Sequence, residues 1–191
     1  MTIEPPTDAE LLRATATGDS ESFKQFVERH RSAVYRYLCS RTGDANAEDA
    51  LQQTFIQAWR HAGTLVIDHD ARAWLFTVAR NALARSHRHS HEQGTETIDS
   101  LGERAGFAAV DASPERFAAA AEEQILLQRA LRALPDLERE ILILRDLEQL
   151  SGEHVAEVLS LSLTAMKSRL HRARLRLVAE LRSRLPAEES R

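Results

Sequence analysis

The chain has 191 residues, of which 43% are apolar, which suits one ordinary domain or two small ones with real hydrophobic cores. Its 25 basic and 29 acidic residues leave a slightly acidic balance, and its single cysteine, Cys39, excludes an intrachain disulfide and fits a reducing compartment. The chain opens without a basic-then-apolar signal, and no apolar run approaches about 18 residues. We therefore expect a soluble, cytoplasmic protein with no membrane insertion of its own.

Strong helix formers dominate the first ninety residues, which predict four helices. Thr7 and Glu10 have the spacing of a capping box at the start of a short helix. A second helix is expected over residues 20–40, a third is capped by Asp44, and a fourth opens at Asp70. Apolar residues recur in these segments at steps of three and four, in the third helix at Ala47, Leu51, Phe55, Ala58 and Trp59.

The segment 91–112 predicts a flexible, acidic linker because it holds three glycines, scattered acidic residues and no sustained periodicity. Helical order resumes at Ser113-Pro114-Glu115, which supplies an N-cap, a proline at the first helical position and an acid near the positive end of the helix dipole. The fold class that follows is all-α, with two small helical domains over residues 1–90 and 113–191.

Beyond the helix that starts near Pro114, further helices are expected over residues 136–146, 151–160 and 163–185. The last two form a short helix, a turn and a longer helix. Charge is segregated onto the longer one: residues 162–191 carry eight Lys and Arg against three Asp and Glu, whereas residues 118–161 carry four against nine. Such a basic helix in a helix-turn-helix pattern indicates contact with DNA.

The two faces of this final helix differ in chemistry. One apolar stripe must pack on the preceding helices, and it consists of Leu163, Met166, Leu170, Ala173, Leu177 and Leu181. The opposite face carries Thr164, Ser168, Arg172 and Leu175, flanked by further basic residues. A helix of this width fits the major groove, where Arg and Lys bond guanine edges. The alternative is a solvated basic face on an ordinary helical bundle.

The segment around this pattern reads ALRALPDLEREILILRDLEQLSGEHVAEVLSLSLTAMKSRLHRARLRL. It resembles region four of bacterial extracytoplasmic-function (ECF) sigma factors, the small specificity subunits of RNA polymerase. The resemblance rests on Leu134-Pro135, Leu150-Ser151 and the basic run from Lys167 to Arg174. Ser160 and Ser162 depart from the Gly and Pro usual in that family, and a Ser in a left-handed turn costs about 1 kcal/mol relative to Gly.

The resemblance implies that the final helix reads the minus-thirty-five promoter element. The implied base contacts are Lys167, Ser168, His171 and Arg172. The implied phosphate contacts are Arg169, Arg174 and Arg176. Each base contact should carry about 1–3 kcal/mol of discrimination.

The N-terminal stretches DSESFKQFVERHRSAVYRYL, AEDALQQTFIQAW and ARAWLFTVARNALARSHRH resemble region two of the same family. This implies minus-ten contacts and promoter melting from Trp74, Arg80, Asn81, Arg85 and Arg88, with a flipped base in the loop 63–69. Trp74 can alternatively belong to the core. Docking on the core polymerase clamp is implied for Glu48, Asp49, Gln52 and Gln53, although the two acids can also merely favour the helix N-terminus.

The resemblance also implies contact with the polymerase flap, and inhibition by an anti-sigma factor. Three histidines, His87, His89 and His91, have a spacing that can bind zinc, but no carboxylate or cysteine is placed to complete a site, so we expect no metal and no cofactor. The sequence carries no glycine-rich phosphate loop, no Ser-His-Asp context and no HExxH pattern, so we expect that the chain is not an enzyme. The competing hypothesis is a free-standing helix-turn-helix regulator that acts without polymerase.

Overall fold

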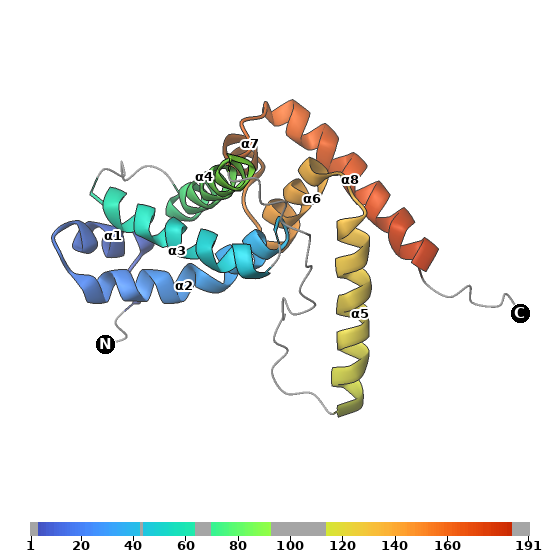
Figure 1. Cartoon of the computed structure of the whole chain (residues 1–191), viewed down its shortest axis with the longest axis horizontal. Coiled ribbons are helices and arrows are strands. Elements are labelled where there is room, and N and C mark those ends of the chain that lie inside the picture. The colour runs from blue at the N-terminus through green and yellow to red at the C-terminus, as the bar shows by residue number, and fades with distance from the viewer. Residues whose placement is uncertain (1–3, 43, 64–69, 93–113, 185–191) are drawn as a thin grey trace, which may run out of the picture.

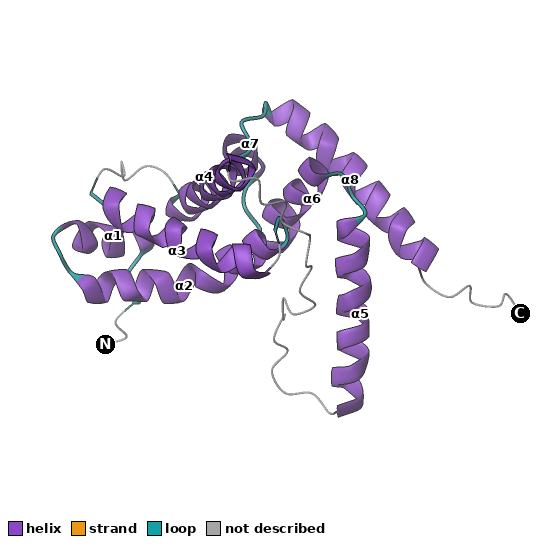
Figure 2. Cartoon of the chain, in the orientation of Figure 1, coloured by secondary structure: helices purple, strands orange, loops and turns teal. Residues whose placement is uncertain are grey.

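A computed structural model describes residues 4–42, 44–63, 70–92 and 114–184, and within these residues helices are joined by loops and turns, without strands (Figures 1 and 2). The N-terminal bundle consists of α1 (Asp8–Ala16), α2 (Ser20–Cys39), α3 (Asp44–His61) and α4 (Ala71–Glu92). The C-terminal bundle consists of α5 (Pro114–Arg132), α6 (Asp136–Leu142), the π-helical turn η1 (Ile143–Leu147), α7 (Gly152–Val158) and α8 (Leu163–Arg184). The all-α prediction is confirmed.

The helices begin where the sequence supplies acceptors for their first N–H groups. Thr7 and Glu10 form the predicted capping box, in which the Thr7 N–H donates to Glu10 Oε2 at 2.8 Å. Asp19 caps α2 and Ser151 caps α7, because the side-chain oxygen of each accepts a backbone N–H group from the first turn of its helix. These local signals fix the helix starts within a residue or two of their predicted positions.

Each bundle closes around its own apolar side chains, and the two cores join in one continuous buried cluster. Phe26, Tyr37 and Phe76 are fully buried in the N-terminal bundle, where the Tyr37 and Phe76 rings meet edge to face at 5.4 Å. Ile141 and Leu144 are fully buried in the C-terminal bundle. Helix α7 packs against α4, so the two bundles touch directly (Figure 1).

The structure differs from the sequence expectations in two segments. The helix expected over residues 136–146 ends at Leu142 and continues as the π-helical turn η1, in which the Glu148 N–H donates to the Ile143 carbonyl at 2.8 Å. Trp59, which the sequence predicts to lie in the apolar stripe of α3, is 42% exposed, and its ring meets the Phe23 ring edge to face with 4.9 Å between the centroids.

The predicted linker lies almost wholly outside the described residues. Helix α4 extends through Glu92, two residues into the predicted linker, and α5 begins at Pro114. Among the helices that the structure describes, none is long and apolar enough to span a bilayer.

Candidate nucleic-acid interface

The helix-turn-helix is built from α7, a four-residue turn and α8. Ser160 takes the left-handed conformation in this turn, with φ of 55°, so the prediction of a serine in that strained geometry is confirmed. Ser162 compensates at the next step, because its Oγ accepts the Ala165 N–H at 3.2 Å and caps α8. At the start of α7, a Cβ on Gly152 would lie 3.0 Å from the Met166 side chain, so the glycine allows α7 to approach α8 closely.

The predicted apolar stripe holds α8 in place. Met166, Leu170 and Ala173 are buried, and Leu163, Leu177 and Leu181 are partly buried. Since the stripe is anchored, the opposite face is fixed toward solvent over several turns. Among the described hydrophobic residues, Leu175 on that face has a high exposure, 59%.

The candidate base contacts lie together on this open face. Lys167, Ser168, His171 and Arg172 are all exposed, and Arg169 beside them is half-buried. Ser168 Oγ donates to the Thr164 carbonyl at 3.0 Å, which leaves its lone pairs free to accept from a base. The face therefore offers cationic donors beside a neutral hydroxyl, a combination that can read base edges.

Two of the candidate phosphate contacts are already paired within the C-terminal bundle. Arg174 donates from Nε and Nη2 to Asp146 at 2.9 Å and 2.6 Å, and Arg176 donates to Glu138 at 2.7 Å. The hydrogen bonds that Arg174 donates to Asp146 raise the pKa of the guanidinium, which stays charged. Both residues fix α8 against α6 and η1, and each keeps further N–H groups for a phosphate.

The candidate residues on α4 fall into two groups. Asn81 and Arg85 are exposed, whereas Trp74 is partly buried and packs against the core. Arg80 points at the C-terminal bundle, where its Nε lies 3.3 Å from Glu140 Oε1. The side chains of Arg88, His87, His89 and His91 lie outside the described residues, as do positions 64–69 of the candidate loop.

The candidate polymerase contacts form a surface on α3. Glu48, Asp49, Gln52 and Gln53 are all exposed, while Ala50, Leu51 and Thr54 on the opposite side of the helix are buried. One turn further, the same surface continues with Ile56 and Trp59, which are 40% and 42% exposed. The sequence analysis did not single out Ile56, although it follows Gln52 by four residues and so lies on the same face.

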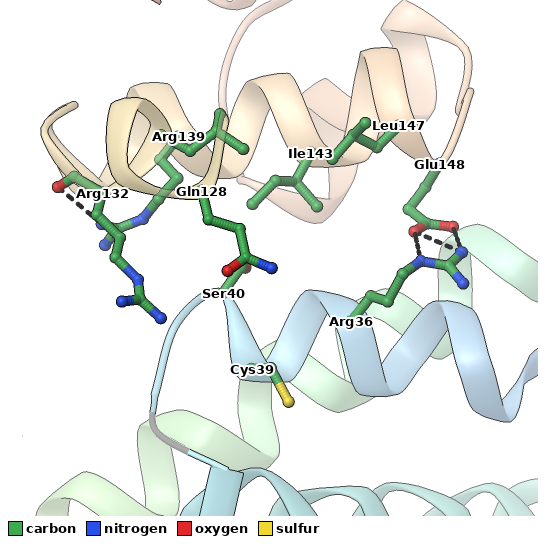
Figure 3. A pocket seen from close by; sticks show the side chains of 10 residues that line it. Arg36, Cys39, Ser40, Gln128, Arg132, Arg139, Ile143, Leu147 and Glu148 are labelled. Carbon is green, nitrogen blue, oxygen red and sulfur yellow. Dashed lines mark hydrogen bonds and ion pairs between the residues drawn. The ribbon is translucent and has the colours of Figure 1, made fainter. Parts of the chain in front are cut away.

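Two carboxylates between the bundles were also not singled out from the sequence. Glu140 and Glu148 are each 1% exposed and meet side chains of α2 and α4. Figure 3 shows the pocket beside Glu148, lined by Arg36, Cys39 and Ser40 from the N-terminal bundle and by Gln128, Ile143 and Leu147 from the other. Within the described residues, no group of three or more His, Cys, Asp or Glu side chains could hold a metal ion.

Comparison with known families places both bundles. Residues 26–92 match sigma-70 region 2, and residues 124–177 match sigma-70 region 4. These two helical modules define a transcription initiation factor of the sigma-70 type. The sequence is 31% identical over 183 residues to the RNA polymerase sigma factor CnrH of Cupriavidus metallidurans, covering 92% of this chain and 96% of that protein.

A second relative gives the same result. The chain is 32% identical over 173 residues to the ECF RNA polymerase sigma factor SigM of Mycobacterium tuberculosis, covering 90% of this chain and 83% of the relative. The chain therefore belongs to the ECF sigma factors of the sigma-70 family, as its sequence patterns predicted.

Two solved structures share the fold. CnrH in complex with the cytosolic domain of CnrY superposes with a TM-score of 0.68 at 26% identity, covering 93% of this chain and 99% of that one. The sigma factor RpoE in complex with the anti-sigma factor NepR from Bartonella quintana also gives 0.68, at 25% identity, with 86% and 99% covered.

Proposed function

We propose that this chain binds core RNA polymerase in the cytoplasm and directs promoter-specific initiation, with residues 1–90 as the polymerase-binding and minus-ten domain and residues 113–191 as the minus-thirty-five domain. The observation that supports this most is the anchored, basic face of α8 in a chain that also carries the polar surface of α3. Membership of the ECF sigma factors supports it independently.

For the minus-thirty-five element, we place α8 in the major groove. Lys167, His171 and Arg172 are exposed along one face, so their donors can reach base edges while Ser168 serves as a neutral partner. Arg169, Arg174 and Arg176 would contact phosphates and fix the register of the helix. The Asp146 and Glu138 pairs support this assignment because they hold Arg174 and Arg176 in fixed positions beside the reading face.

For the minus-ten element, the exposed Asn81 and Arg85 would contact DNA first, and Arg80 would join them once it leaves Glu140. Arg88 and the loop 63–69 complete the proposed surface. Trp74 packs against the core, which favours a supporting role over a free stacking platform. Unpaired bases gain about 1–3 kcal/mol each by stacking on the face of an aromatic ring, so the exposed part of the Trp74 ring would assist melting.

For the polymerase, α3 would dock on the clamp through its four exposed polar residues, extended by Ile56 and Trp59. A polar surface that continues into exposed apolar side chains has the composition of a protein interface, in which aromatic residues carry much of the affinity. We also propose an anti-sigma factor as a partner, since both structural relatives were solved with one or with a cytosolic protein domain bound.

Run-off transcription with purified core polymerase on a genomic library tests the proposal. We expect discrete start sites that require the chain. Arg85→Ala should reduce transcription from those sites, while Arg13→Ala, which removes an exposed charge from α1, should not. If the chain instead binds operator DNA tightly without polymerase and yields no transcripts, it is a free-standing regulator and the proposal is wrong.

A further inference from the structure

The contact between the two bundles combines apolar packing, the His154–Asp70 pair and a set of charged groups that neither bundle satisfies alone. Glu140 on α6 and Glu148 after η1 are buried carboxylates of the C-terminal bundle. Among the described residues, the polar side chains that contact these two carboxylates come from the N-terminal bundle: from α2, from Arg41 just after it, and from α4. We call this set the ion-pair cluster: Glu140 and Glu148 with Arg36, Arg41, Arg72 and Arg80.

Two arginines form hydrogen-bonded ion pairs with Glu148. Arg36 reaches Oε1 from Nε and Nη2, at 3.2 Å and 3.0 Å, and Arg72 reaches Oε2 from Nη2 at 2.8 Å (Figure 3 shows the Arg36 side). Both carboxylate oxygens are therefore engaged, and the Arg72 guanidinium also lies over the Phe76 ring at 5.9 Å. This is a full, charge-assisted coordination of one acid by two helices of the other bundle.

Glu140 is held by a hydroxyl and two arginines. Tyr37 donates its O–H to Oε1, Arg80 Nε lies 3.3 Å from the same oxygen, and Arg41 approaches Oε2 at 3.9 Å. Burial raises the pKa of the Tyr37 phenol, and the charge of Glu140 raises it further, so the hydroxyl remains a donor. The cluster thus pairs two acids with four arginines, each 24–38% exposed.

The excess of arginine shows what else could occupy these sites. Guanidinium groups bind carboxylates and phosphates with the same forked geometry. Arg80 belongs to the proposed minus-ten surface, and Arg72 lies two turns before it on α4. In this conformation, Glu140 and Glu148 therefore occupy positions that DNA phosphates would take on α4.

The closed arrangement also conflicts with binding both promoter elements at once. The two elements are centred roughly 25 base pairs apart, or about 85 Å at 3.4 Å per base pair. Bundles whose side chains lie within hydrogen-bond distance cannot reach both elements of a straight duplex. The ion-pair cluster has to break before the two proposed DNA surfaces can work together.

We propose that the ion-pair cluster is an autoinhibitory contact: Glu140 and Glu148 hold the C-terminal bundle over the arginines of α2 and α4, and the DNA backbone competes with them for Arg72 and Arg80. The inhibitory effect of this contact rests on the proposed function, whereas the contact itself does not. Opening exposes both acids and all four arginines to water, so each charge regains solvation and the contact is reversible.

The first experiment measures closure in the full chain. Dyes are attached to cysteines introduced by Ser32→Cys on α2 and Ala133→Cys after α5, two exposed positions near the pocket that both bundles line, in a Cys39→Ser background. We expect high energy transfer at low salt, and lower transfer at high salt or with a 25-base-pair duplex, because the arginines are partly exposed and screened. Glu140→Gln with Glu148→Gln should give low transfer at all salt concentrations. Glu157→Gln, which removes an exposed acid from α7, should match the unmodified chain.

The second experiment measures the consequence. If about nine chains in ten are closed, E140Q/E148Q should saturate core polymerase and promoter at about ten-fold lower concentration. The double substitution R36Q/R41Q removes two arginines of the cluster and leaves the proposed DNA contacts in place, so it should lower the saturating concentration by a similar factor. If E140Q/E148Q loses its helical circular dichroism, the result for R36Q/R41Q decides whether the contact is autoinhibitory.

The outcomes separate the two claims. If energy transfer is unchanged in both charge variants, the ion-pair cluster does not hold the two bundles together. Open variants with unchanged affinity overturn the autoinhibition. Absence of transcripts from every chain, with energy transfer as expected, overturns the proposed function while the closed contact stands.

Discussion

The two bundles present their arginines in opposite ways. On α8, Lys167, His171 and Arg172 face solvent, and no described residue of the other bundle pairs with them, while Arg174 and Arg176 pair with acids of their own bundle. On α2 and α4, Arg36, Arg72 and Arg80 turn instead toward acids of the other bundle. One candidate DNA surface is thus complete and open, and the other is partly covered.

The contrast shows that an arginine of a DNA-binding chain can already be paired with an acid of the same chain and so be unavailable to DNA. Burying a carboxylate is costly unless it is paired, so Glu140 and Glu148 favour a closed chain only while the arginines are available. A ligand that binds Arg72 and Arg80 more tightly in the open state than in the closed state shifts the chain toward the open state, by as much as the two affinities differ. The proposed minus-thirty-five surface on α8 needs no such release.

The largest effect should come from the support beneath the open surface. Met166→Ala removes a side chain that is 1% exposed between α7 and α8, and we expect it to lower the free energy of unfolding by about 2–5 kcal/mol. Chemical denaturation followed by circular dichroism measures this. Val178→Ala, on the same helix but 46% exposed, should change stability by less than about 0.5 kcal/mol. Equal effects would show that α8 is not anchored through Met166.

The open face itself should show the next largest effect. Arg172→Ala should weaken holoenzyme binding to a cognate promoter by about 1–3 kcal/mol and relax discrimination at one minus-thirty-five base, because a base contact is lost. Fluorescence anisotropy on matched and mutated promoters measures both. Arg182→Ala removes the same charge from the last turn of α8 and should act far less. Loss of core binding in Arg172→Ala would show that α8 serves the polymerase.

Much of the open surface was predictable because its determinants are local. The steps from Met166 to Leu170 and Ala173 set the buried side of α8, and the acceptor oxygens of Thr7 and Ser151 set helix starts within one turn. Each of these signals operates over three or four residues, where helix geometry alone decides which side chains are neighbours. The candidate DNA contacts lie on the side of α8 opposite the apolar stripe.

The covered surface was not predictable because its partners are far apart in the sequence. Arg36 and Glu148 are 112 residues apart, and Tyr37 and Glu140 are 103 apart. A helical pattern marks Glu140 only as an acid in an apolar run, and the π-helical turn that follows it shifts the register of Glu148. Ile56 and Trp59 show the same limit: periodicity identifies apolar positions but not which of them a neighbour covers.

The surface on α3 gives a smaller test, which compares it with an exposed apolar residue elsewhere. Trp59→Ala should weaken binding to core polymerase by about 1–2 kcal/mol, as expected for an aromatic residue at an interface. Titration of labelled core measures the affinity. Ile125→Ala, at a comparably exposed position on α5, should leave that affinity unchanged. Equal losses would show that the polymerase contact is not specific to the α3 surface.

The smallest effect should come from releasing a paired arginine on the open side. Asp146→Asn removes the acid that holds Arg174, so the guanidinium gains freedom to reach a phosphate and one nearby negative charge disappears. Affinity for promoter DNA should rise modestly, and the slope of log K against log salt should steepen by at most about one unit, because one more counterion is released. A loss of affinity would mean that Asp146 contributes by positioning Arg174. The internal pairs on α8 would then prepare its DNA surface, whereas the pairs between the bundles withhold the one on α4.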